Sequence, residues 1–448
     1  MSFQQLFAFF MALLTFFSGR VMSVVGSTDA TPIVATQREY RFDQDSLLLG
    51  AYCFRVDEHF EETREWFKEA GLQFSVAVSG NQLTGDDLDW FLDNGLGIIA
   101  PRSDYYKNMR HDAIWGIDLR DEPPATDFPA LQEQVQELYA QDPNRFPLIN
   151  LFPMYANTEQ LAEECDVPLA RDEIRAEPFN GNSIRYRMHL SDYIGTVDSD
   201  IISADIYPLY IDNATGKLNT YGHWLRNLDI LADACRASGR DLWAITQAAG
   251  NAKEEGGGMR HCDNAEDQRW QNYVSLAFGA KAIIYGCYYT GWWDQSSHMI
   301  DNSGKRTATY YAVQQVNSEM AAFAETYGNY EIQGTTLYNR LNPDCAGAEL
   351  DISKAGKKYQ PVTLTKDPVL CGCFTEKDGD GSAYVFANMY EPDTGKEAAF
   401  SATFPGAKSI TVYRMGEKTV IDGSTLTLTL ENREGVFVTV DGASGPIC

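Results

Sequence analysis

The strongest constraint on the fold is a repeated alternation of short apolar segments with amphipathic ones. Eight apolar segments of strand length occur between about residues 45 and 330, with helical patterns between them. The predicted strands are residues 47–54, 74–78, 96–101, the run around Trp115, 146–153, 201–208, 241–247 and 280–289. This pattern predicts an α/β fold, a parallel (β/α)8 TIM barrel. A doubly wound open sheet is the alternative, but no Gly-x-Gly-x-x-Gly motif follows the first strand.

The sequence pattern changes near residue 334, where alternating apolar and polar residues replace the strand and helix repeats. Short segments of this kind cover residues 382–388, 409–413 and 425–430, separated by Gly, Asp and Asn turns. They predict a small all-β sandwich after the barrel. We therefore expect a signal peptide at 1–27, a linker at 28–44, the barrel at 45–333 and the C-terminal β-sandwich domain at 334–448.

The N-terminus predicts export. Residues 6–17 form an apolar run too short to span a bilayer, and the small residues Gly26 and Ser27 follow, although residues 1–5 carry no Lys or Arg. We expect the mature chain to be secreted or extracytoplasmic. No other segment is long and apolar enough for membrane insertion, and the oligomeric state stays open.

Charge and aromatic content narrow the class of ligand. The chain has 36 basic and 63 acidic residues and a net charge of −27, which repels phosphate backbones and anionic lipids. We therefore expect no nucleic-acid partner. The 8 Trp, 24 Tyr and 23 Phe exceed what a core needs, and such a surplus commonly lines clefts that stack on flat or sugar-like ligands.

Two adjacent carboxylates, Asp121 and Glu122, end the fourth predicted strand and are followed by two prolines. Active sites of such barrels lie at the C-terminal strand ends, so this pair is the first candidate. Consecutive strand side chains point to opposite faces, so the two converge only if the backbone turns after Asp121. Pro123 favours that turn because the residue before a proline is pushed into an extended conformation and no helix can start across it.

Other polar and aromatic residues follow the remaining strands. The candidates at these ends are Asn150, Tyr155, Asp205, Tyr207, Gln247, Trp292, Trp293 and Asp294. Carboxylates and aromatic rings dominate this set. It contains neither a basic cluster suited to phosphates nor a His, Asp and Glu group with metal geometry, so we expect no metal and no cofactor.

Several of these motifs resemble the barrel glycoside hydrolases of clan A and neighbouring uncharacterised glycosidase-like barrels. They are Trp115-Gly116-x-Asp118-x-x-Asp121-Glu122-Pro123, Asn150-Leu151-Phe152-Pro153, Asp205-x-Tyr207-Pro208, Gln247 and Gly279-Ala280-Lys281-Ala282-Ile283-Ile284-Tyr285. The resemblance covers most of residues 45–330, and the β-rich tail is similar to the accessory sandwich of such enzymes. It implies a secreted hydrolase of a polysaccharide or glycan, with a carbohydrate substrate and Glu122 as general acid/base.

Glycosidic cleavage needs a proton donor and a second group that stabilises or traps the oxocarbenium-like centre. Repulsion by Asp121 predicts a raised pKa for Glu122, which suits a proton donor. Clan A enzymes place a nucleophilic Glu at the end of the seventh strand, where this chain has Gln247. Asp205 is then the best second carboxylate, as the base of an inverting mechanism or an atypical nucleophile. It is alternatively a partner that orients Tyr207 or an Arg.

Two further interpretations remain open. A substrate-assisted N-acetylhexosaminidase uses an adjacent Asp-Glu pair such as Asp121 and Glu122, and it needs no protein nucleophile. A non-catalytic carbohydrate-binding barrel would stack sugars on Trp292 and Trp293 and use the carboxylates only to bind hydroxyls. For a glycosidase with or without substrate assistance, the predicted substrate contacts are Asn150, Tyr155, Tyr207, Gln247, Trp292, Trp293 and Asp294.

Overall fold

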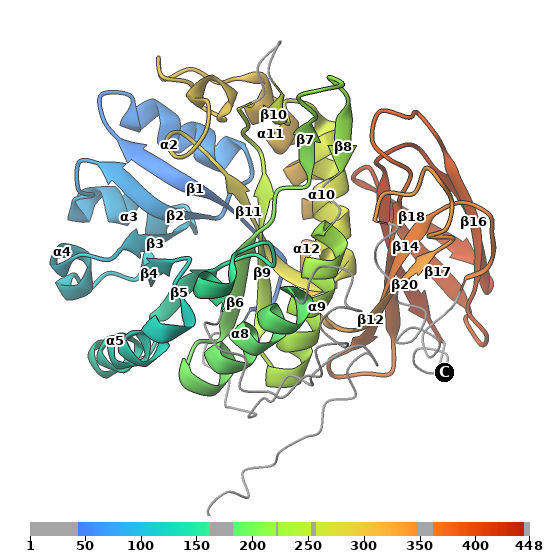
Figure 1. Ribbon diagram of the computed structural model, residues 1–448, viewed down its shortest axis with the longest axis horizontal. Helices are drawn as coiled ribbons and strands as arrows, with labels where there is room; N and C mark the ends of the chain where they lie inside the picture. The colour runs from blue at the N-terminus through green and yellow to red at the C-terminus, as the bar shows by residue number, and fades with distance from the viewer. Residues whose placement is uncertain (1–43, 162–181, 221–222, 252–256, 348–361, 443–448) are drawn as a thin grey trace, which may run out of the picture.

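The protein is built around a closed barrel of eight parallel strands (Figure 1). The computed structural model describes residues 44–161, 182–220, 223–251, 257–347 and 362–442. The barrel strands are β1 (Leu48–Val56), β2 (Phe74–Gly80), β3 (Gly97–Pro101), β4 (Ile114–Asp121), β5 (Phe146–Leu151), β6 (Ile201–Asp205), β9 (Asp241–Gln247) and β11 (Ala280–Gly286). Their order around the barrel is β1-β11-β9-β6-β5-β4-β3-β2, and every neighbouring pair is parallel. The predicted (β/α)8 barrel is confirmed.

Three barrel strands end earlier than predicted. β5 ends at Leu151, β6 at Asp205 and β11 at Gly286. Beyond the end of β11 the chain stays bonded to β1, since the Tyr288 amide donates to the Tyr52 carbonyl at 2.7 Å. After β6 comes Pro208, which has no amide hydrogen for a strand ladder.

Helices cover the outside of the barrel (Figure 1). They are α2 (Phe60–Glu69), α3 (Gly85–Asp93), α4 (Asp104–Asn108), α5 (Phe128–Gln141), α6 (Thr158–Leu161), α8 (Asn182–Thr196), α9 (Trp224–Ser238), α10 (Ala265–Ala277), α11 (Ala308–Ala321) and α12 (Ala324–Gly328), with 3-10 turns η1 (Ala125–Asp127) and η2 (Gln295–Ser297). Local signals set their ends. A capping box between Thr84 and Asp87 begins α3, and Gly239, in the left-handed conformation at φ 66°, ends α9.

Large side chains fill the inside of the barrel. Phe74 and Trp115 fit there because the neighbouring strands carry glycines. A Cβ atom on Gly50 would lie 2.5 Å from the Phe74 ring, and one on Gly97 would lie 2.1 Å from the Trp115 ring. The barrel centre is therefore a packed core, and open space remains only toward the strand ends.

A small antiparallel sheet adjoins the C-terminal ends of the barrel strands. Its strands are β7 (Leu209–Ile211), β8 (Leu218–Thr220) and β10 (Gly258–Met259), in the order β10-β7-β8. β7 follows β6 and β10 follows β9, so both segments start from the C-terminal end of the barrel. This sheet forms part of the rim around the candidate site.

The C-terminal region forms two antiparallel sheets, which confirms the predicted β-sandwich fold. One sheet has the order β12 (Tyr330–Tyr338), β14 (Val369–Glu376), β15 (Ser382–Asn388), β20 (Gly435–Asp441), β17 (Ser409–Arg414) and β18 (Glu417–Asp422). The other has the order β13 (Val362–Thr365), β16 (Ala398–Thr403) and β19 (Thr425–Leu430). A separate apolar core lies between them.

The sandwich packs closely on helix α10 of the barrel (Figure 1). A Cβ atom on Gly372 would lie 2.3 Å from the Ala277 carbonyl oxygen, so β14 approaches the helix backbone there. The Trp270 ring nitrogen donates to the Asn388 carbonyl at 2.9 Å. Asp267, fully buried, pairs with Arg260 of the barrel at 2.9 Å and with Arg433 of the sandwich.

The predicted signal peptide and nearly all of the predicted linker lie outside the described residues. Export and the domain boundaries therefore stay predictions. In the part of the chain that the structure describes, no helix combines the length and apolarity needed to cross a membrane.

Asp267→Asn should lower the free energy of unfolding by about 1 to 3 kcal/mol, because the partly buried Arg260 and Arg433 lose their buried counterion and keep only the exposed Asp393. Urea denaturation measures the change. Asp263→Asn, an exposed position one turn earlier, is the matched control and should stay within about 0.5 kcal/mol of the unmodified protein. Equal effects of the two substitutions would contradict a role for Asp267 in joining the domains.

Candidate active site

A bulge near the end of β4 sets the direction of its carboxylates. The pairing of β4 with β5 passes from Asp118 opposite Leu148 directly to Arg120 opposite Ile149, so Leu119 is the extra residue. Leu119 packs in the core outside the barrel, and the exposed Arg120 pairs with Asp127 at 3.3 Å. Asp118 and Asp121 therefore face the barrel axis together, which strict alternation over three residues would forbid.

Glu122 joins them because the backbone turns at this residue, but its conformation is left-handed and not the extended one predicted from Pro123. β4 ends at Asp121, and Glu122 has a φ of 43°, a left-handed conformation that is unfavourable for a residue with a side chain. Its amide donates to the Asn150 carbonyl at 2.8 Å, which holds the turn. Backbone strain at this position is consistent with selection for function.

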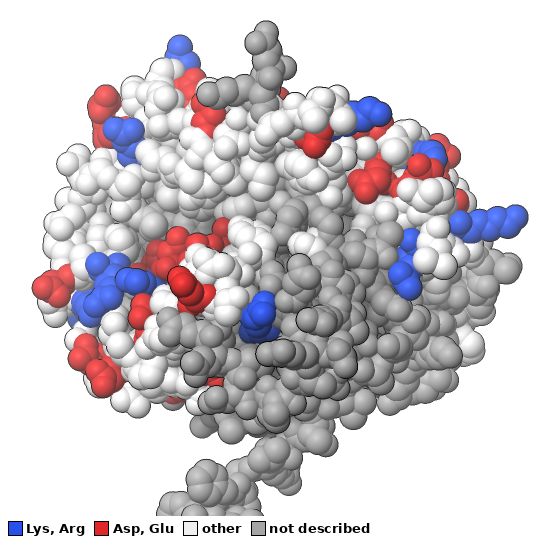
Figure 2. Space-filling view, in the orientation of Figure 1, with Lys and Arg blue, Asp and Glu red and all other residues white. Residues whose placement is uncertain are grey.

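A cavity of about 410 Å³ brings most of the predicted site residues together at the C-terminal ends of the strands. Its lining residues are Tyr52, Asp121, Glu122, Asn150, Tyr155, Asp205, Tyr207, Ile245, Met259, Trp292 and Trp293. Eight of the ten predicted site residues are among them. Figure 2 shows acidic side chains gathered in a hollow on the barrel part of the visible face.

Asn150 links two of the carboxylates. Its Nδ2 atom donates to Asp121 Oδ1 at 2.9 Å and to Asp205 Oδ1 at 3.0 Å. A primary amide has two hydrogens, so both are used by these bonds. Asn150 therefore holds the ends of β4 and β6 at a fixed separation and has no N–H left for a substrate.

Burial and mutual repulsion raise the pKa values of three carboxyl groups. Burial, followed by the charges of Asp205 and Asp121, raises the pKa of Glu122 to about 7. Burial also raises the pKa of Asp205 to about 6, against the hydrogen bond from Asn150 and together with the charge of Asp121. The raised pKa of Glu122 agrees with the sequence-based expectation, but its main cause is burial, and repulsion by Asp121 is the smallest of the three causes.

Asp118 is a carboxylate to which the sequence assigned no role. Burial, with a contribution from Asp121, raises its pKa to about 7. Tyr52, at the end of β1, is a second residue that the sequence did not identify, although it lines the cavity. The alternation of Leu48, Gly50 and Tyr52 in the first strand was the available signal, because alternate residues of a barrel strand face inward. Ile245 and Met259 also line the cavity, and Met259 carried no such signal.

Gln247 and Asp294 lie outside the cavity lining, so the structure does not support their predicted substrate contacts. Gln247 is fully buried, and its Nε2 atom donates to the carbonyls of Leu209 at 2.8 Å and Arg260 at 2.9 Å. Its Oε1 accepts from the Leu209 amide at 3.0 Å. Gln247 thus attaches the rim sheet to the barrel. Asp294 is exposed and accepts from the Ser296 amide, which begins η2 and lowers the pKa of Asp294.

Aromatic rings form one wall of the cavity. The Tyr207 and Trp293 rings meet edge to face, with centroids 4.5 Å apart, and Tyr52 meets Trp292 in the same way at 5.6 Å. Trp292 lies against Gly286, where a Cβ atom would be 2.6 Å from the indole. Such rings offer flat apolar faces beside the carboxylates, an arrangement suited to a ligand with both C–H and O–H surfaces.

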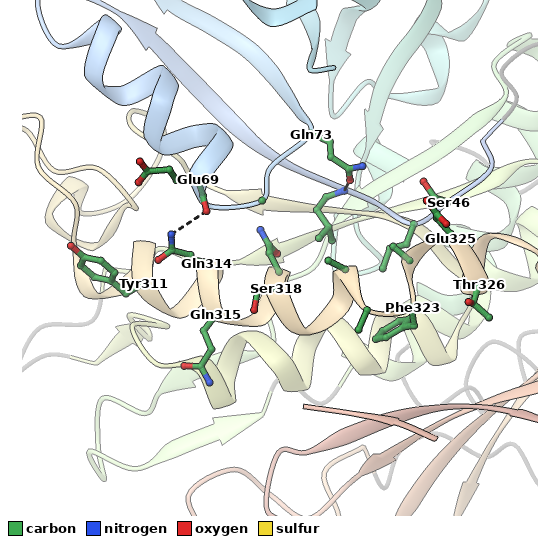
Figure 3. Close-up of a pocket in the computed structure, with 17 residues that line it drawn as sticks. Ser46, Glu69, Gln73, Tyr311, Gln314, Gln315, Ser318, Phe323, Glu325 and Thr326 are labelled. Atoms are coloured by element: carbon green, nitrogen blue, oxygen red, sulfur yellow. Dashed lines mark hydrogen bonds between the residues drawn. The ribbon is translucent and has the colours of Figure 1, made fainter. Parts of the chain in front are cut away.

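A larger cavity, about 840 Å³, lies elsewhere in the described structure (Figure 3). It lies between α2, the start of β1, α11 and α12, beside the N-terminal ends of the barrel strands. Its labelled polar residues are mainly amides and hydroxyls, such as Gln73, Gln315 and Ser318, and Gln314 donates to the Glu69 carbonyl at 3.0 Å. It lacks a group of facing carboxylates, so the smaller cavity is the candidate active site.

Comparisons with known proteins are limited to the fold. No protein-family model and no curated protein sequence matches this chain. Among solved structures, a GH27 β-L-arabinopyranosidase from Geobacillus stearothermophilus is similar over 89% of this chain and 98% of that chain, at 10% identity and a TM-score of 0.41. α-Galactosidase I from Mortierella vinacea is similar over 90% and 99%, at 10% identity and a TM-score of 0.38.

A 3-deoxy-D-arabino-heptulosonate 7-phosphate synthase from Thermotoga maritima is similar over 63% of this chain and 88% of that chain, at 11% identity and a TM-score of 0.34. The resemblance to clan A-like glycosidase barrels is confirmed for the fold, since the structure is a closed barrel of eight parallel strands. Within the described residues, no group of three His, Cys, Asp or Glu side chains is placed to hold a metal ion.

Asp118→Asn should stabilise the protein more at pH 8 than at pH 4.5. The folded-state pKa of Asp118 lies near 7 against an ordinary value of 3.8, so folding is disfavoured as the pH rises from about 4 to 7. Removing this carboxyl should raise the free energy of unfolding at pH 8 by about 3 kcal/mol relative to its effect at pH 4.5. Urea denaturation at both pH values measures the difference. Asp112 is exposed just before the start of β4, and Asp112→Asn should show no difference between the two pH values. If Asp118→Asn changed the free energy of unfolding equally at both pH values, the raised pKa of Asp118 would be refuted.

Proposed function

We propose that this protein is a glycoside hydrolase, with Glu122 as general acid/base and Asp205 as the second carboxylate. The observation that carries the proposal is the presence of both groups in one cavity, with pKa values raised to about 7 and about 6. Between these values Glu122 retains its proton while Asp205 is ionised. Such a pair supplies the two roles that glycosidic cleavage requires.

The proposed reaction begins with proton donation from Glu122 to the leaving glycosidic oxygen. Positive charge then develops on the sugar ring, and the Asp205 carboxylate stabilises it, either by activating a water molecule or by direct attack. Asn150 positions Asp205 through the 3.0 Å hydrogen bond. The aromatic wall of Tyr207, Trp292 and Trp293 would hold the ring next to these groups.

Gln247 does not count against this proposal. A standard two-glutamate retaining mechanism would need a carboxylate at that position, but Gln247 is buried and bonded to the rim sheet. The second carboxylate of this proposal is therefore Asp205, at the end of β6. Asp121 shares the Asn150 amide with Asp205, so the substrate-assisted mechanism with the Asp121-Glu122 pair is the competing use of the same cavity.

Glu122→Gln should reduce kcat/KM by about 100-fold or more, because the amide keeps the shape but cannot donate the proton at neutral pH. Hydrolysis of a panel of α- and β-linked 4-nitrophenyl glycosides and of polysaccharides measures the loss. Glu133→Gln on the exposed face of α5 is the matched control and should keep full activity. Binding of sugars without turnover by the unmodified protein would overturn the enzyme proposal in favour of a binding barrel.

Asp121→Asn should move the optimum of the pH profile to lower pH. Activity requires ionised Asp205 and protonated Glu122, so the rate falls below about pH 6 and above about pH 7. The charge of Asp121 raises both pKa values, so removing it lowers both. The pH dependence of kcat/KM tests this shift.

The same variant separates the two mechanisms. Under substrate assistance, Asp121→Asn would abolish turnover of N-acetylated substrates, since it removes the group that orients the acetamide. Residual activity with shifted limbs supports the role of Asp205 proposed here, whereas complete loss confined to N-acetylated substrates would contradict it.

A further inference from the structure

Among the described residues, the lining of the candidate active site is acidic. Its ionisable groups in this part of the chain are Asp121, Glu122, Asp205 and three tyrosines, and none of the described lining residues is Lys, Arg or His. Asp118 adds a further carboxyl close enough to raise the pKa of Tyr52. The basic residue of β4, Arg120, is exposed and turned outward to Asp127. More carboxyl groups meet here than the two that glycosidic cleavage uses.

These carboxyl groups lack a counterion within the site. Their mutual repulsion in a partly buried environment favours any ligand that brings positive charge and opposes any ligand that brings negative charge. A sugar carrying a carboxylate or sulfate would be repelled by this lining, since none of its described residues is basic. A sugar carrying an ammonium group would supply the missing counterion.

The aromatic wall favours the same sign of charge independently. The face of an aromatic ring is the negative part of its quadrupole, and a cation within about 6 Å of the ring centre is attracted to it. Tyr52, Tyr207, Trp292 and Trp293 all line the cavity. Because Tyr207 meets Trp293, and Tyr52 meets Trp292, edge to face, the rings differ in orientation and present faces from more than one direction.

We propose that the sugar bound at the site of cleavage is a hexosamine with a free, protonated amino group. This inference rests on the proposed glycosidase function and names its substrate class. The ammonium group would lie among the carboxylates and aromatic rings that line the cavity. N-acetylation removes the positive charge, so N-acetylated sugars should be poorer ligands, which also disfavours the substrate-assisted mechanism.

The test compares sugars that differ in charge on the same leaving group. The 4-nitrophenyl glycosides of glucosamine, N-acetylglucosamine, glucose and glucuronic acid, in both anomers, are assayed at pH 6 and low ionic strength. We expect kcat/KM for the glucosaminide to exceed that for the glucoside by about tenfold or more, and the glucuronide to be the poorest substrate. Added salt should reduce the preference.

Asp118→Asn probes the charge without altering the cavity lining. At pH 7, where a pKa of about 7 leaves Asp118 about half ionised, the substitution should reduce the ratio of kcat/KM for the glucosaminide over the glucoside about twofold, because it removes one of the repelling carboxyl groups. Asp112 is exposed just before the start of β4, and Asp112→Asn should leave this ratio unchanged. An equal decrease for both substrates would indicate a structural effect only and would contradict a contribution of Asp118 to charge selection.

The outcomes separate this inference from the function on which it rests. Hydrolysis of glucosides at the same rate as glucosaminides, or a preference for N-acetylated or acidic sugars, would overturn the inference and leave the glycosidase function intact. No hydrolysis of any glycoside would overturn the function. If no glycoside is hydrolysed, calorimetry with glucosamine and glucose still tests the ligand class. Equal binding of the two sugars, or binding of neither, would overturn the preference for an amino sugar as well.

Discussion

The bulge in β4 is the constraint on which the candidate site depends. Without the extra residue at Leu119, Asp118 and Asp121 would point to opposite faces of the barrel wall. The bulge directs Asp121 inward, and the left-handed turn at Glu122 then brings a second carboxylate to the same cavity. Two local departures from regular strand geometry therefore produce the chemistry, and the regular barrel holds them in place.

Burial raises the pKa values of these carboxyl groups, and the barrel tolerates the unfavourable energy of burying them. Ionised groups brought together in a low-dielectric space repel one another and lose hydration, which raises their pKa values. The Asn150 amide offsets part of this by donating to both Asp121 and Asp205. The remaining unfavourable energy is small beside that of the packed lumen and helix layers, which can hold the site in a strained, reactive arrangement.

The sequence allowed the fold and the acidic pair to be predicted because both depend on local patterns. The strand and helix repeats follow from apolar spacing, and Pro123 marks the end of the fourth strand, although it predicts an extended and not a left-handed Glu122. The sequence did not predict the bulge, because the run around Trp115 has the same apolar pattern with or without it. The role of Gln247 was also out of reach, because its partners Leu209 and Arg260 come from segments distant in sequence.

The C-terminal sandwich is part of the frame of the site. Met259 lines the cavity, and the next residue, Arg260, pairs with Asp267 of α10 at 2.9 Å and with Asp393 of the sandwich at 2.7 Å. The Thr220 hydroxyl, in the same rim sheet, donates to Glu391 at 2.6 Å. Two contacts from one sandwich loop thus reach the sheet that borders the cavity. Because charged contacts of this kind fix orientation more than they add stability, the sandwich positions the rim of the cavity in addition to covering the apolar surface of α10.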